Sequence, residues 1–148
     1  MNTQRAQHWA CWLAGLWGGV LCGIGLIGAP AGFATTLPET AGRIAGRMFA
    51  QEAYLSLALA MALFLLLRRV ARAAAQVGRG SVFSADMLLA LGALFCTVAG
   101  YFALQPMMAA ARAGQGNWSF AALHGVSAGL YALKALLVVV LAWRLARR

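Results

Sequence analysis

Residues 119–148 read SFAALHGVSAGLYALKALLVVVLAWRLARR, and this stretch decides the fold. The 24 residues from Phe120 to Trp143 include only two side chains that can carry charge, His124 and Lys134. A helix of that length crosses about 30 Å of hydrocarbon with some tilt. The stretch therefore predicts a membrane-spanning helix.

The polar side chains of this span fall on one side of the predicted helix. At 100° per residue, those of His124, Ser127, Tyr131 and Lys134 lie within an arc of about 80°. Such groups cost several kcal/mol apiece in hydrocarbon, so they are expected inside a bundle with partners from other helices.

The composition of the whole chain agrees with a membrane domain. Of its 148 residues, 63% are hydrophobic and 10% are charged, whereas a soluble domain is about 45 to 50% apolar. The net charge is +9, but the arginines flank hydrophobic runs and are not interleaved with aromatic residues, which speaks against nucleic-acid binding. Cys11, Cys22 and Cys96 have no CxxC spacing and are expected to act as small hydrophobic residues.

Four hydrophobic runs predict membrane spans at about residues 9–36, 41–70, 85–110 and 119–145. A cytoplasmic loop is expected at 68–86, with a helical extension that lies at the membrane surface. The first run is too long for the hydrophobic region of a cleaved signal peptide. Thr40 and Ser84 are expected to cap the second and third helices. The prediction is a single all-α transmembrane domain over residues 1–148, an integral membrane four-helix bundle.

The distribution of basic residues predicts the orientation. Eight lie on the side of the two termini and the middle loop: Arg5, Arg68, Arg69, Arg72, Arg79, Arg144, Arg147 and Arg148. Three lie on the other side: Arg43, Arg47 and Arg112. By the positive-inside rule, both termini are expected to be cytoplasmic, in a bacterial inner membrane.

Glycines recur at helical spacing in two spans. Gly15, Gly19 and Gly23 form a tandem GxxxG pattern, and Gly125 and Gly129 repeat the spacing in the last span. Such faces let a neighbouring helix backbone come close. They are predicted to be packing faces, available for a homo-oligomer or a membrane protein partner.

Polar stripes on the second, third and fourth spans are predicted to converge in a pocket in the outer half of the membrane. Its predicted members are Arg43, Arg47, Gln51, Glu52, Tyr101, Gln105, His124, Ser127, Tyr131 and Lys134. For Arg43 and Arg47, the alternative is that they reach outward to the lipid headgroups.

Glu52 and Lys134 are expected at similar depths. Glu52 lies about 5 Å outside the membrane midplane and Lys134 about 4 Å inside it, at 1.5 Å of rise per residue. One hypothesis is that the two charges pair inside the bundle. The alternative is that Lys134 reaches toward the inner surface while Glu52 bonds to Tyr101 or Arg47.

A metal or haem site is a second hypothesis. His124 is expected near the depth of Met107, Met108 and Met48, and imidazole and thioether ligands suit Cu(I) or a haem iron. The alternative is that the methionines only pack and that His124 bonds to a neighbouring helix.

Several segments together resemble a known family. They are Trp17-Gly18-Gly19, Ala29-Pro30 with Phe33, AGRIAGRMF at residues 41–49, Gln105-Pro106 with Arg112, and Phe120, Leu123-His124 and Ser127. The chain resembles the transmembrane protein 205-like family (domain of unknown function 4149), small four-span membrane proteins without assigned biochemistry. It departs from that family at Tyr131, where a small polar residue is common, and at Lys134. The family is distantly similar to copper-resistance D-like and HemJ-like proteins, whose membrane histidines bind haem or metal, and this likeness implies the same candidate role for His124.

These observations favour a non-enzymatic function. The sequence has no G-x-S-x-G, Walker A or H-E-x-x-H motif and only three carboxylates. We expect a structural or accessory membrane subunit, or a small binding protein with a polar pocket, in contact with membrane lipids. The alternatives are a haem- or copper-binding redox protein using His124, and a small-molecule or ion carrier that works as an oligomer.

Overall fold

The computed structural model describes residues 2–148, and its regular elements within them are all helices. In chain order they are α1 (Thr3–Cys22), the π-helix η1 (Gly23–Gly28), α2 (Ala29–Thr35), α3 (Pro38–Gln76), α4 (Ala85–Thr97), the π-helix η2 (Val98–Ala103), α5 (Leu104–Arg112) and α6 (Phe120–Ala146). They join into four continuous segments that are long and apolar enough to cross a membrane: Thr3–Thr35, Pro38–Gln76, Ala85–Arg112 and Phe120–Ala146. The predicted all-α bundle with four spans is confirmed.

The segment predicted as the middle loop, residues 68–86, begins as a continuation of α3, which runs through the basic residues to Gln76. Residues 70–75 include four alanines, which favour helix strongly, and the first residue with a positive φ is Gly78. Residues 77–84 are the non-helical part of that segment.

Helix starts follow familiar capping rules. Ser84 caps α4 by accepting a hydrogen bond from the Met87 amide, as predicted, and Ser119 caps α6 in the same way. The prediction for Thr40 was wrong: α3 begins at Pro38, a residue preorganised for the first turn of a helix.

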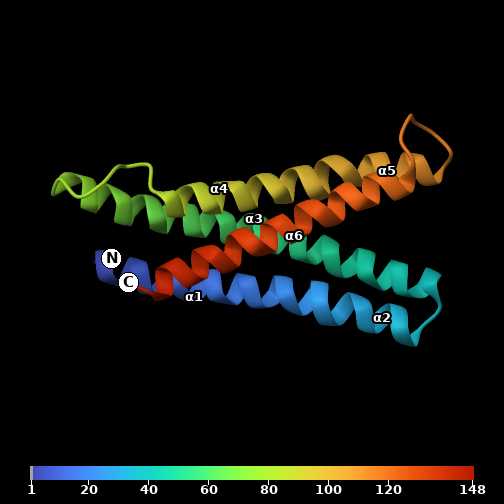
Figure 1. The fold of residues 1–148 in the computed structure, drawn as a ribbon, viewed down its shortest axis with the longest axis horizontal. Helices are drawn as coiled ribbons and strands as arrows, with labels where there is room; N and C mark the ends of the chain where they lie inside the picture. The colour runs from blue at the N-terminus through green and yellow to red at the C-terminus, as the bar shows by residue number, and fades with distance from the viewer. Residues whose placement is uncertain (1) are drawn as a thin grey trace.

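The four segments pack around a square. α1 packs on α3 and α6, and α4 also packs on α3 and α6, so α3 and α6 occupy one diagonal of the bundle and α1 and α4 the other. The largest fully buried apolar side chains are Trp17, Leu21, Leu63, Leu141 and Val138. Both termini and residues 77–84 lie at one end, here called the terminal end (Figure 1). Residues 36–37 and 113–119 lie at the other, here called the hairpin end.

The bundle opens toward the hairpin end. There α2 packs on α3 and α5 packs on α6, and Figure 1 shows these two pairs diverging. No residue of η1 or α2 is buried, whereas α1 buries six. The hydrophobic core therefore lies in the terminal half, and the polar side chains discussed next lie where the opening begins.

Candidate functional site: the polar network around α6

A buried ion pair joins the two helices on the diagonal of the bundle. Lys134 Nζ lies 2.8 Å from both Oε1 and Oε2 of Glu52, and the two side chains are 4% and 2% exposed. Each charge would be costly in this surrounding without the other. The structure thus shows the pair, and not the alternative in which Lys134 turns to the membrane surface.

The pair extends into a network that reaches a third helix. Ser56 Oγ donates a hydrogen bond to Glu52 Oε1, and Trp17 Nε1 donates one to Ser56 Oγ at 2.8 Å. The network thus connects α1, α3 and α6. Sequence reasoning missed both added residues; Ser56 could have been found because it lies one helical turn from Glu52, whereas no polar pattern pointed to Trp17.

The other hydroxyls of the α6 stripe bond to backbone carbonyls. Ser127 Oγ donates to the carbonyl of Gly100, and Tyr131 Oη donates to that of Leu21, both at 2.8 Å. Gly100 lies within η2, and Leu21 lies two residues before η1. π-Helical segments interrupt the regular backbone ladder, so side chains from a neighbouring helix can bond there. Each of the three other segments thus supplies a partner to α6.

The ring of Tyr131 also packs against the backbone of η1. A Cβ built on Gly25 would lie 2.9 Å from Cε1 of Tyr131, so the ring occupies the space of a side chain at position 25. A second ring, that of Phe49, makes a T-shaped contact with Tyr131, with 5.1 Å between the ring centroids. Lys134 Nζ lies 4.9 Å from the centroid of the Tyr131 ring, within cation–π range.

The structure does not bring the whole predicted pocket together. Arg43, Arg47, Gln51 and His124 are exposed on the outside of the bundle, and Tyr101 and Gln105 are half-buried. Because the helix pairs diverge at the hairpin end, these side chains do not converge on one chamber. Of the predicted members, only Glu52, Ser127, Tyr131 and Lys134 make hydrogen bonds to another helix within the described residues.

Met48 lies on a different helix pair from the other predicted ligands for metal or haem. Met48 Sδ would lie 3.6 Å from a Cβ on Gly28, within the pair of α2 and α3, whereas Met107 and Met108 belong to α5, which packs on α6. His124 stacks on Phe120 at 5.7 Å between ring centroids. Within residues 2–148, no three His, Cys, Asp or Glu side chains cluster in a way that could hold a metal ion.

The glycines predicted to form packing faces do not pack inside this bundle. A Cβ at Gly15, Gly19, Gly23, Gly125 or Gly129 would meet no atom within 4 Å. The close helix contacts involve other glycines, among them Gly18 against Val138 and Gly100 against Leu130. The predicted faces are therefore open to other molecules.

A second ion-pair cluster closes the terminal end. Asp86, in the first turn of α4 and 1% exposed, binds Arg144 Nε at 2.8 Å and Arg148 Nη2 at 2.6 Å. Sequence reasoning missed this cluster, since Asp86 was taken only as the boundary of a loop. The two buried carboxylates of the described residues, Glu52 and Asp86, are therefore both in ion pairs.

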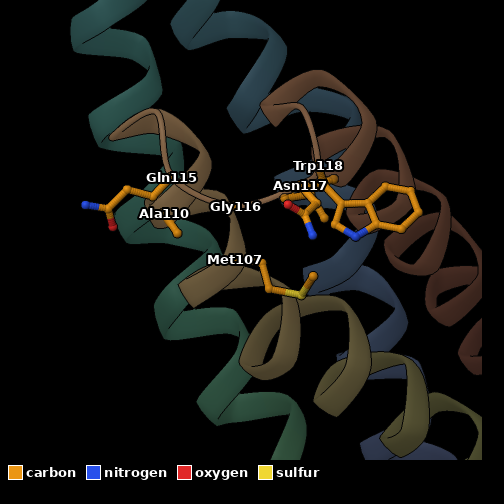
Figure 2. Close-up of a pocket in the computed structure, with 7 residues that line it drawn as sticks. Met107, Ala110, Gln115, Gly116, Asn117 and Trp118 are labelled. Atoms are coloured by element: carbon orange, nitrogen blue, oxygen red, sulfur yellow. The ribbon is translucent and has the colours of Figure 1, made fainter.

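A shallow recess of about 180 Å³ lies at the hairpin end, between α5 and α6. Its lining residues are Met107, Ala110, Gln115, Gly116, Asn117, Trp118 and Leu123. Figure 2 shows Met107, Asn117 and Trp118 around the recess, with the amide of Gln115 extending away from it.

The fold and the network define a class: a multi-pass helical membrane protein whose internal charges neutralise each other. The chain belongs to the family described as "Domain of unknown function (DUF4149)", which matches residues 12–117. The match includes Trp17, Glu52 and Ser56 and ends before Lys134. Comparisons with curated proteins and with solved structures find no match.

Proposed function

We propose that this protein is a non-enzymatic accessory subunit of the bacterial inner membrane, which binds another membrane protein chain along its exposed helix faces. The observation that carries the proposal is Gln51. Its side chain lies within the span Pro38–Gln76 and is exposed on the outside of the bundle. An amide in hydrocarbon without a partner costs several kcal/mol, so a polar group from another chain is its expected neighbour.

Exposed glycines on other faces of the bundle would also allow a close helix contact. Gly42 and Gly46 lie about 180° and 140° round α3 from Gln51. They have no atom within 4 Å of a built Cβ, and both are exposed. Gly15 and Gly19 on α1 are exposed in the same way. Helix association in lipid depends on such small residues, which let backbones approach, and on hydrogen bonds between polar side chains.

A photo-crosslinking amino acid at position 51 tests this proposal in the native membrane. We expect it to give a discrete protein adduct, whose mass and peptide content identify either a second copy of this chain or a different protein. The matched control is the same amino acid at Leu65, which is 53% exposed on the same helix but apolar. The control is expected to give no adduct.

A purely lipid-facing α3 would give the opposite result. Positions 51 and 65 would then crosslink to lipid equally, and no protein adduct would form at either. Gln51→Leu provides an independent readout, because it is expected to dissociate the complex on native gels while the monomer stays folded.

A further inference from the structure

We propose that the turn between α5 and α6 binds one anionic phospholipid. Arg112 binds the phosphate, and the recess between α5 and α6 holds the start of an acyl chain. This site is separate from the face of α3 that carries the proposed function. Three features support this site: the charge of Arg112, the contact of its side chain with Phe120, and the apolar recess of the same turn.

The charge of Arg112 is not neutralised within the described residues. The chain has three acidic residues. Glu52 pairs with Lys134, Asp86 binds Arg144 and Arg148, and Glu39 lies in the first turn of α3. The hairpin end also carries Arg43 and Arg47, so it has an excess of positive charge that complements an anionic headgroup.

Aromatic stacking holds the Arg112 side chain at the end of its helix. Its guanidinium carbon lies 4.5 Å from the centroid of the Phe120 ring, and the same ring stacks with His124 at an interplanar angle of 15°. A guanidinium lying over a ring keeps its N–H groups, which point outward in its own plane, free for oxygen acceptors. These N–H groups match the spacing of two phosphate oxygens, and arginine commonly binds a phosphate through two such hydrogen bonds.

The recess makes a phospholipid a better occupant than a free phosphate. Met107, Ala110, Trp118 and Leu123 provide an apolar surface, and Asn117 adds one amide. Arg112 ends one span and Phe120 begins the next, so the cluster lies where the chain leaves the hydrocarbon. Tryptophan at that depth is typical of the membrane interface. The phosphate of a lipid headgroup would therefore meet Arg112, and the adjoining methylene groups would meet the apolar recess.

Native mass spectrometry of the full-length protein, released from nanodiscs, tests the site. One sample contains only phosphatidylcholine, and the other contains part phosphatidylglycerol with the same acyl chains. We expect a single phosphatidylglycerol to stay bound to the wild type. Arg112→Gln is expected to lower its retention about fivefold, the effect of roughly 1 kcal/mol per arginine near an anionic lipid.

Matched variants separate this site from general charge attraction. Arg79→Gln removes the same charge at the terminal end and is expected to leave retention unchanged, whereas Arg112→Lys should keep part of it. Trp118→Ser is expected to weaken binding through the recess. An excess of soluble glycerol phosphate that displaces the lipid completely would contradict a role for the recess.

The proposal is overturned if both lipids are retained equally by the wild type, or if Arg112→Gln and Arg79→Gln behave alike. Arg112 is exposed, so its substitution is expected to leave the fold intact. Circular dichroism and elution volume confirm that each variant is folded before its spectrum is interpreted.

Discussion

Glu52 and Lys134 are side chains that a membrane interior tolerates only together. Their carboxylate and ammonium groups make two contacts of 2.8 Å across the diagonal of the bundle. Replacing a buried pair with apolar residues can be nearly neutral, whereas removing one partner leaves an isolated charge. We therefore expect the pair to specify which helices meet, and at what register, more than it adds net stability.

A double-mutant cycle at this pair tests that interpretation. Glu52→Gln and Lys134→Met are each expected to lower the free energy of unfolding by about 3–5 kcal/mol, since each leaves a buried charge without its partner. The double variant should lose much less than the sum of the two. Chemical unfolding in detergent measures all three variants against the wild type, and additive losses would contradict an energetic coupling.

At the scale of helices, α6 was the element most accessible to sequence reasoning. Its polar stripe was predicted from spacing alone, and Ser127, Tyr131 and Lys134 all find partners on other segments. The identity of those partners was harder to predict. Ser127 and Tyr131 bond to backbone carbonyls, which no side-chain pattern reveals, and both carbonyls lie in or near π-helical segments.

The stripe on α3 shows the opposite outcome. Arg43, Arg47 and Gln51 follow helical spacing as regularly as the stripe on α6, yet they face outward. Spacing determines which residues share a face, but only packing determines where that face points. Glu52 lies 100° round the helix from Gln51, and this single step separates the buried network from the exposed stripe.

Asp86 joins the start of α4 to the end of α6 through its ion pairs with Arg144 and Arg148. Asp86→Asn is expected to lower the free energy of unfolding by about 1–2 kcal/mol, a modest loss because Arg144 and Arg148 are 42% and 43% exposed and water screens them. Hydrogen exchange should rise in residues 85–90 and 141–148.

The matched control for this change is Glu39→Gln. It also removes a carboxylate from the first turn of a helix, but from an exposed position without an ion pair in the described residues. Its expected effect is below about 0.5 kcal/mol, typical of the surface. Equal hydrogen exchange in Asp86→Asn and Glu39→Gln would show that the contacts of Asp86 with Arg144 and Arg148 do not stabilise the terminal end.

For the whole molecule, composition and hydropathy were enough to predict the fold class and the number of spans. Four apolar segments separated by short polar turns leave few other arrangements in a bilayer. The predicted outer chamber failed for a reason outside the reach of hydropathy, namely that α2 with α3 and α5 with α6 form separate pairs at the hairpin end.

The orientation of the bundle follows from its charge distribution and remains a prediction. Cysteines placed at Ser81 and Gln115, in a variant without native cysteines, should react oppositely with a membrane-impermeant thiol reagent. Because basic residues are retained in the cytoplasm, position 115 is expected to react in intact spheroplasts and position 81 only in inverted vesicles. Reaction at position 81 in spheroplasts would reverse the assigned orientation.

The link between Glu52 and Lys134 spans 82 positions of the chain, and it constrains how the protein is made. A ribosome completes α3 long before it reaches α6, so the acid must wait for its counter-ion during synthesis. Until the last helix enters the bilayer, that acid has to take up a proton or keep water beside it. A nascent chain that stops before α6 would therefore hold a carboxyl group in the membrane without its lysine partner.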